Sequence, residues 1–132
     1  MKFGSVWGFN SDDLASTVGQ RQSAVFKKGF IMTKVAVWAV IPAAPGKRDE
    51  LAAALSGALE TAKSEAGTIY YILHTDPTKD DVLYMYEMYE NQDALNVHMG
   101  SEAFKALGPA IGPFLGGRPE LTFLGPIGGK GA

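Results

Sequence analysis

Two residues of the sequence, His98 and Glu87, have side chains suited to acid–base chemistry. His98 lies early in a predicted helical stretch, and an imidazole titrates near neutral pH, so it can take a proton from a substrate hydroxyl. A structural role is the alternative, with the ring capping a helix or packing between helix and sheet.

Glu87 lies in the middle of an apolar strand face, where a buried carboxylate needs a partner, and His98 or Arg118 is the expected one. A Glu87–His98 pair would orient the imidazole and raise its basicity, whereas a structural Glu87 would satisfy helix or loop amides.

Aromatic side chains on the predicted strands form a second candidate feature. Side chains of this kind can line a pocket for a flat substrate and bind its oxygens, although most serve as core or interface. Strand parity places Tyr89 on the face of Glu87, which we take as the side covered by helices, and places Tyr84 and Tyr86 on the other. The residues expected to contact the substrate are Tyr89, Tyr71 and Trp38, together with Asn96 and Arg118, which could steady an oxyanion.

Composition and spacing exclude several other kinds of site. The sequence has no cysteine, and its two histidines lie in separate elements with His74 expected at the surface, so we expect no metal site. The glycines at 112–117 lack the Lys-Ser/Thr of a phosphate loop, and no dinucleotide fingerprint is present. A net charge of −2 without a basic cluster argues against nucleic acid. No apolar run is long enough for a membrane span and no signal peptide is recognisable, so a cytoplasmic location is the default expectation.

Hydrophobic periodicity predicts the elements that must position these residues. Residues 34–41, 68–75, 82–90 and 118–124 have the pattern of strands, and 47–66 has a helical stripe followed by Gly67. A second helical region begins at 91, is interrupted at Gly100, and continues over 102–107 with Ser101 as its cap, whereas 108–119 is expected to be irregular. The order strand, helix, strand, strand, helix, strand predicts an α+β domain with a ferredoxin-like antiparallel sheet.

The predicted domain organisation has three parts. Residues 1–31 form an N-terminal extension with a possible helix over 12–28, residues 32–127 form the ferredoxin-like domain, and residues 128–132 form a tail. The extension is either a mobile arm, even sequence upstream of a start at Met32, or an arm that docks on the body or on a partner subunit.

The third predicted strand is apolar on both of its faces. Tyr84 and Tyr86 alternate with Leu83, Met85 and Glu87, so neither face has the polar pattern of a sheet surface in water. Helices can cover one face of the sheet. A second copy of the chain is the simplest cover for the other, and we therefore expect a homodimer.

The order of short motifs over residues 34–127 resembles the antibiotic-biosynthesis-monooxygenase domain. The motifs are Pro-Gly-Lys-Arg at 45–48, Gly-Thr-Ile-Tyr-Tyr at 67–71, Tyr-Glu-Met-Tyr-Glu at 86–90, Asp-Ala-Leu at 93–95, His98, and Ser-Glu-Ala-Phe at 101–104. The resemblance implies a dimeric α/β barrel in which two sheets face each other. It also implies one pocket per subunit between sheet and helices, with His98 at the position of a recurrent family histidine.

The same resemblance implies a cofactor-independent monooxygenase. Its substrates would be dioxygen and a small electron-rich aromatic, such as a quinol, an anthrone or a polyketide-like compound, with His98 as the base. Two alternatives stay open, namely a dimeric module that binds a small molecule without catalysis and a haem-degrading oxygenase. The haem-degrading members have a histidine that ligates the haem iron where this chain has Gly108. They also have a tryptophan in the third strand where this chain has Tyr89, and both departures argue against haem.

Overall fold

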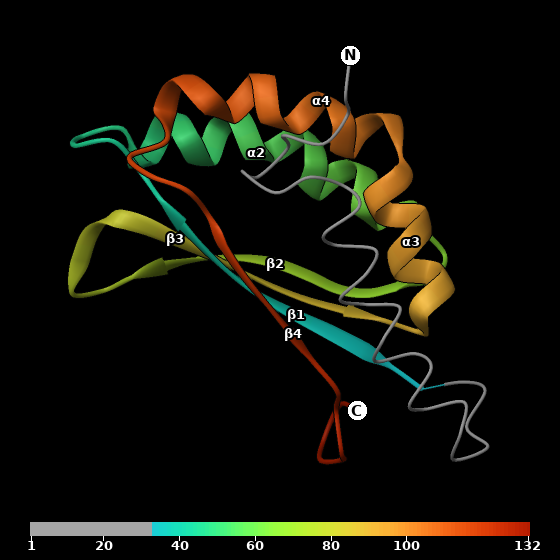
Figure 1. Cartoon of the computed structure of the whole chain (residues 1–132). Helices are drawn as coiled ribbons and strands as arrows, with labels where there is room; N and C mark the ends of the chain where they lie inside the picture. Colours follow the sequence, from blue (N-terminus) through green and yellow to red (C-terminus); the bar gives the residue numbers. More distant parts are fainter. Residues whose placement is uncertain (1–32) are drawn as a thin grey trace.

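The computed structural model describes residues 33–132, so the possible helix over 12–28 lies outside the described residues. Figure 1 shows the described chain as a curved sheet with helices along one side. The elements are β1 (Val35–Pro42), α2 (Arg48–Lys63), β2 (Thr68–Asp76), β3 (Lys79–Tyr89), α3 (Gln92–Gly100), α4 (Glu102–Ile111), the 3₁₀ turn η2 (Gly112–Phe114) and β4 (Glu120–Leu124).

The four strands form one antiparallel sheet in the order β2-β3-β1-β4. This order, with α2 after β1 and the α3–α4 pair after β3, is the ferredoxin-like arrangement predicted from the sequence, and the prediction is confirmed. The β2–β3 hairpin is tighter than expected. Asp76 pairs with Lys79, and the Asp76 carboxylate accepts a hydrogen bond from the backbone N–H of Thr78 at 2.9 Å, so β3 begins three residues earlier than predicted.

The second helical region is broken where the sequence predicts. The hydroxyl of Ser101 accepts a hydrogen bond from the backbone N–H of Phe104 at 3.2 Å and so caps α4. The prediction that 108–119 is irregular is wrong at its start, because α4 continues through Pro109 to Ile111. Leu107 and Ile111, one turn apart, are both buried, and this packing outweighs the backbone hydrogen bond that Pro109 cannot donate.

The main core lies between the helices and the inner face of the sheet. The helices pack against side chains of β1 and β3. Three of their residues are fully buried there, namely Leu51 and Leu55 of α2 and Ile111 of α4. The buried residues of this cluster are Ala39, Ile41, Ala43, Leu51, Leu55, Leu83, Met85, Leu107 and Ile111.

The outer face of the sheet carries large apolar side chains in contact with solvent. Trp38, Ile72 and Leu124 are 37 %, 46 % and 41 % exposed, and the Trp38 ring stacks on Tyr84 with centroids 5.3 Å apart. The prediction that the sheet is apolar on both faces is therefore confirmed for the single chain. Among the described residues, no helix combines the length and the apolar character needed to cross a membrane.

Candidate functional site

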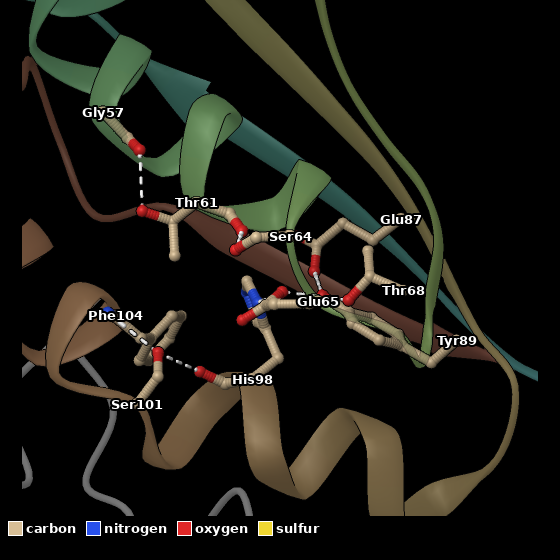
Figure 2. Close-up of polar contacts among 10 residues, drawn as sticks. All are labelled: Gly57, Thr61, Ser64, Glu65, Thr68, Glu87, Tyr89, His98, Ser101 and Phe104. Carbon is tan, nitrogen blue, oxygen red and sulfur yellow. Dashed lines mark hydrogen bonds and ion pairs between the residues drawn. The ribbon is translucent and has the colours of Figure 1, made fainter.

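His98 lies on the buried face of α3, near the end of that helix. Asn91 caps the start of α3, its side chain accepting a hydrogen bond from the backbone N–H of Ala94 at 2.9 Å. Leu95 and His98, three residues apart, then point toward the sheet, and His98 is only 6 % exposed. In Figure 2 the imidazole lies between α3 and the residues that follow α2.

The imidazole is held by a carboxylate from a distant part of the chain. Nδ1 of His98 lies 2.9 Å from Oε1 of Glu65, just after α2. The same oxygen accepts a hydrogen bond from the hydroxyl of Thr68 at 2.9 Å. Because an ionised carboxylate only accepts hydrogen bonds, this contact places the imidazole proton on Nδ1 and leaves Nε2 of the neutral ring with a free lone pair. Glu65, Thr68 and His98 therefore form a chain that fixes both the orientation and the tautomer of the ring.

The other ring nitrogen, Nε2, is buried and has no hydrogen-bond partner among residues 33–132. A buried polar atom without a partner is unusual and calls for an explanation such as a bound ligand. Aromatic rings surround the imidazole, with centroids at 5.0 Å for Tyr71, 5.3 Å for Tyr89 and 5.4 Å for Phe104. The site therefore offers an oriented basic nitrogen in an aromatic environment.

Gly67 allows α3 to pack closely against the loop that carries Glu65. A Cβ atom added at Gly67 would lie 2.5 Å from Cβ of Ala94, in the first turn of α3. Since real Cβ atoms do not approach so closely, any side chain at 67 must push α3 away from the loop.

We expect Gly67→Ala to lower the free energy of unfolding by about 1–3 kcal/mol, because the new methyl group overlaps Ala94. The matched control is Gly57→Ala in α2, where nothing lies within 4 Å of the added Cβ. That control should gain up to about 1 kcal/mol from helix propensity. Urea denaturation measures the free energy of unfolding of both variants. Equal values for the two would show that the close approach of Gly67 to Ala94 does not affect stability.

Glu87 lies on the same inner face but is not the partner of His98. The register places it between Val37 of β1 and Tyr71 of β2, and it is 7 % exposed. Its Oε1 accepts a hydrogen bond of 2.5 Å from the hydroxyl of Tyr89. The expected Glu87–His98 pair is thus replaced by two separate pairs, Glu87–Tyr89 and Glu65–His98.

Burial determines the protonation of these groups. It raises the pKa of the Glu87 carboxyl to about 7; the hydrogen bond from Tyr89 opposes the rise and the negative charge of Glu65 adds to it. Burial, followed by the charge of Glu87, also raises the pKa of the phenols of Tyr71 and Tyr89 well above their ordinary value. Both tyrosines therefore keep their protons and remain hydrogen-bond donors at neutral pH.

The structure brings some of the predicted substrate-binding residues together and leaves others apart. Tyr71 and Tyr89 lie beside His98. Trp38 lies on the opposite face of the sheet, paired with Tyr86 in the register. Asn96 is exposed on α3, where it accepts a hydrogen bond from the side chain of Gln92 at 3.0 Å.

Two more predicted positions lie at the surface. Arg118 is exposed in the segment between η2 and β4. His74 is exposed on β2, as expected.

Two residues of the site, Glu65 and Phe104, were not among the predicted candidates. One signal pointed to Glu65: an acidic residue at the C-terminal end of a helix is unfavourable for the helix dipole, so a partner elsewhere is expected. Phe104 carried no comparable signal. Among residues 33–132, no group of three or more histidine, aspartate and glutamate side chains is arranged to hold a metal ion.

Comparison with known proteins identifies one matching family and several solved structures with the same fold. Residues 34–109 match the profile of the family described as antibiotic biosynthesis monooxygenase. A crystal structure of a candidate antibiotic biosynthesis monooxygenase from Caulobacter crescentus CB15 is 29 % identical, with a TM-score of 0.69 over 78 % of this chain and 98 % of that one. No curated protein matches the chain.

Two further solved structures are similar to the same extent. PA3566 from Pseudomonas aeruginosa is 27 % identical, with a TM-score of 0.68 over 76 % of this chain and 100 % of that one. Rv0793 from Mycobacterium tuberculosis is 26 % identical, with a TM-score of 0.68 over 74 % of this chain and 99 % of that one.

Proposed function

Because the chain belongs to the antibiotic biosynthesis monooxygenase family, we propose that it oxidises a small electron-rich aromatic with dioxygen and needs no cofactor. The substrate class is a quinol, an anthrone or a similar polyketide-like phenol. One observation carries the proposal, namely the buried Nε2 of His98, which has no partner among the described residues and belongs to a ring fixed by Glu65. A base of this kind is what the first step of such an oxidation requires.

The chemistry begins with removal of a proton. Nε2 of His98 accepts the proton of the substrate hydroxyl, and Glu65 stabilises the resulting imidazolium. The substrate anion then gives one electron to dioxygen, and the radical and superoxide combine to form a carbon–oxygen bond. The imidazolium returns its proton to the peroxide anion, and loss of water from the hydroperoxide then leaves the quinone, so one oxygen atom enters the product and the other leaves as water.

The aromatic side chains around His98 bind the ring of the substrate in this proposal. Tyr71, Tyr89 and Phe104 contact the imidazole at ring distances of 5.0–5.4 Å and offer faces and edges to a flat molecule. The hydrogen bond of His98 is to Glu65, and Glu87 accepts its own from Tyr89, so we assign the orientation of the imidazole to Glu65. Trp38, Asn96 and Arg118 have no part in the proton transfer.

Oxygen consumption with a dihydroxynaphthalene or an anthrone tests the proposal. The predicted result is uptake that depends on both the protein and the aromatic, with one dioxygen consumed per quinone formed. If calorimetry shows that aromatics of this class bind but none is turned over, the chain is instead a small-molecule-binding module of the same fold.

We also propose that the chain works as a homodimer in the cytoplasm, the outer faces of two sheets packing together. The exposed Trp38, Ile72 and Leu124 on that face support the dimer, since apolar side chains gathered on one face are costly in water.

In this arrangement, Trp38→Glu should raise the dimer dissociation constant by about a hundredfold, because it puts a charge into an apolar interface. Analytical ultracentrifugation at micromolar concentration measures the change. Ala53→Glu, at an exposed position of α2, is the matched control and should remain dimeric. An unmodified chain that sediments as a stable monomer would contradict the dimer.

A further inference from the structure

The proposed proton transfer to His98 does not involve the Glu87–Tyr89 hydrogen bond. Glu87 is on β3, next to the central strand β1, and within residues 33–132 its side chain forms one hydrogen bond, which it accepts from Tyr89. No lysine or arginine within residues 33–132 forms a salt bridge with it. A carboxyl so placed is buried without a cation to balance its charge.

The groups that face Glu87 from the neighbouring elements favour its neutral form. Glu65, from the loop after α2, is negative; Tyr71 of β2 and Tyr89 of β3 are neutral phenols. His98 of α3 is the one possible cation of this group, and it is already bonded to Glu65. Ionising Glu87 therefore adds a second negative charge to the cluster, and both its burial and the charge of Glu65 raise its pKa.

Protonation of Glu87 changes what Tyr89 can do. An ionised carboxylate only accepts, so the phenol must donate its hydrogen to Glu87. A neutral carboxylic acid has a hydrogen of its own and can donate to the phenol oxygen. The hydrogen of Tyr89 is then free for another acceptor on the side of the His98 ring, which Figure 2 shows next to Tyr89.

We propose that Glu87 is a positioning residue whose proton sets the direction of the Glu87–Tyr89 hydrogen bond, and so turns the Tyr89 hydroxyl into a donor for an anionic oxygen bound beside His98. The inference rests on the proposed function, because the oxygen in question is the phenolate formed there. The hydroxyl stabilises that anion while the imidazolium holds the transferred proton. Raising the pH past the titration of Glu87 withdraws the donor.

The first test is an infrared measurement on the unliganded protein. Difference spectra between the unmodified chain and Glu87→Gln should contain the C=O stretch of a protonated carboxylic acid at pH 6, and this band should disappear as the pH is raised to 8. A spectrum with only the carboxylate bands of Glu87 across this range overturns the inference, whatever the oxygen uptake shows.

The second test is the binding of 2-naphthoate, an aromatic anion whose own charge is constant from pH 6 to 8. For the unmodified chain, the dissociation constant should rise about tenfold over this range, as one hydrogen bond to an anion is lost. Glu87→Gln keeps His98 but lacks the carboxyl that titrates, so its dissociation constant should change less than that of the unmodified chain. Tyr89→Phe, which retains Glu87 but lacks the donor, should bind weakly at pH 6 with the same reduced pH dependence.

Identical pH profiles for the unmodified chain and Glu87→Gln would overturn the inference. These binding and infrared results do not require turnover, so they are separable from the proposed activity. Absence of oxygen uptake together with the predicted profiles would remove the monooxygenase and leave the Glu87–Tyr89 switch in place.

Discussion

Replacing His98 with alanine should lower oxygen uptake with a quinol or anthrone by at least about tenfold, since general-base catalysis contributes about 10²–10⁴-fold. Nε2 of this ring is buried without a partner among residues 33–132, so the substitution removes the base to which the proposal assigns the substrate proton. The loss should appear in kcat more than in KM, because the aromatic walls formed by Tyr71, Tyr89 and Phe104 remain.

Two further variants make this result interpretable. His98→Gln keeps a side chain that can reach Glu65 but cannot act as a base, so it should be as inactive as His98→Ala while keeping more of the stability. Val97→Ala is the control on the same helix, because Val97 precedes His98 in α3 but is 68 % exposed. Uptake that is unchanged in His98→Ala would remove His98 from the mechanism.

The second large effect is on the pH dependence of stability. Burial raises the pKa of Glu87 from 4.5 to about 7, so between these pH values the folded chain holds a proton that the unfolded chain has released. The folded state binds more protons in this window, and the free energy of unfolding must therefore fall as the pH rises through it. The loss is on the order of 3 kcal/mol, and it levels off below pH 4.5 and above pH 7.

Glu87→Gln should abolish most of this dependence, because the amide has a similar shape and no charge to bury. Urea denaturation between pH 4.5 and pH 8 measures the unmodified chain, Glu87→Gln, and the control Glu60→Gln, whose side chain is exposed on α2. The control should follow the unmodified chain. Equal slopes for the unmodified chain and Glu87→Gln would mean that Glu87 ionises in the folded state as easily as in water.

Much of the fold is predictable from local sequence because its signals are local. The β-branched and aromatic residues of the strands, the stripe of α2 and the hydroxyl of Ser101 each act within a few residues, and together they give the element order and the break between α3 and α4. The continuation of α4 to Ile111 is not predictable locally, because Pro109 argues against a helix, whereas burial of Ile111 depends on the packing of the whole domain.

The site is less predictable, because it depends on contacts between residues far apart in the chain. His98 and Glu87 stand out by their residue types and surroundings, but the partner of His98 is 33 positions away in a loop. Parity within β3 predicts correctly that Glu87 and Tyr89 share a face. The register between strands is not visible in the sequence, so the prediction that Trp38 contacts the substrate is wrong for this face: Trp38 pairs with Tyr86 on the opposite side of the sheet.

The most direct test of the central claim is the spectrum of a dihydroxynaphthalene bound without oxygen, at a pH where it is neutral in solution. If Nε2 of His98 takes the substrate proton, anaerobic mixing with the unmodified chain gives the absorption of the naphtholate, and mixing with His98→Ala gives that of the neutral naphthol. A bound naphthol that remains neutral in the unmodified chain would contradict the account.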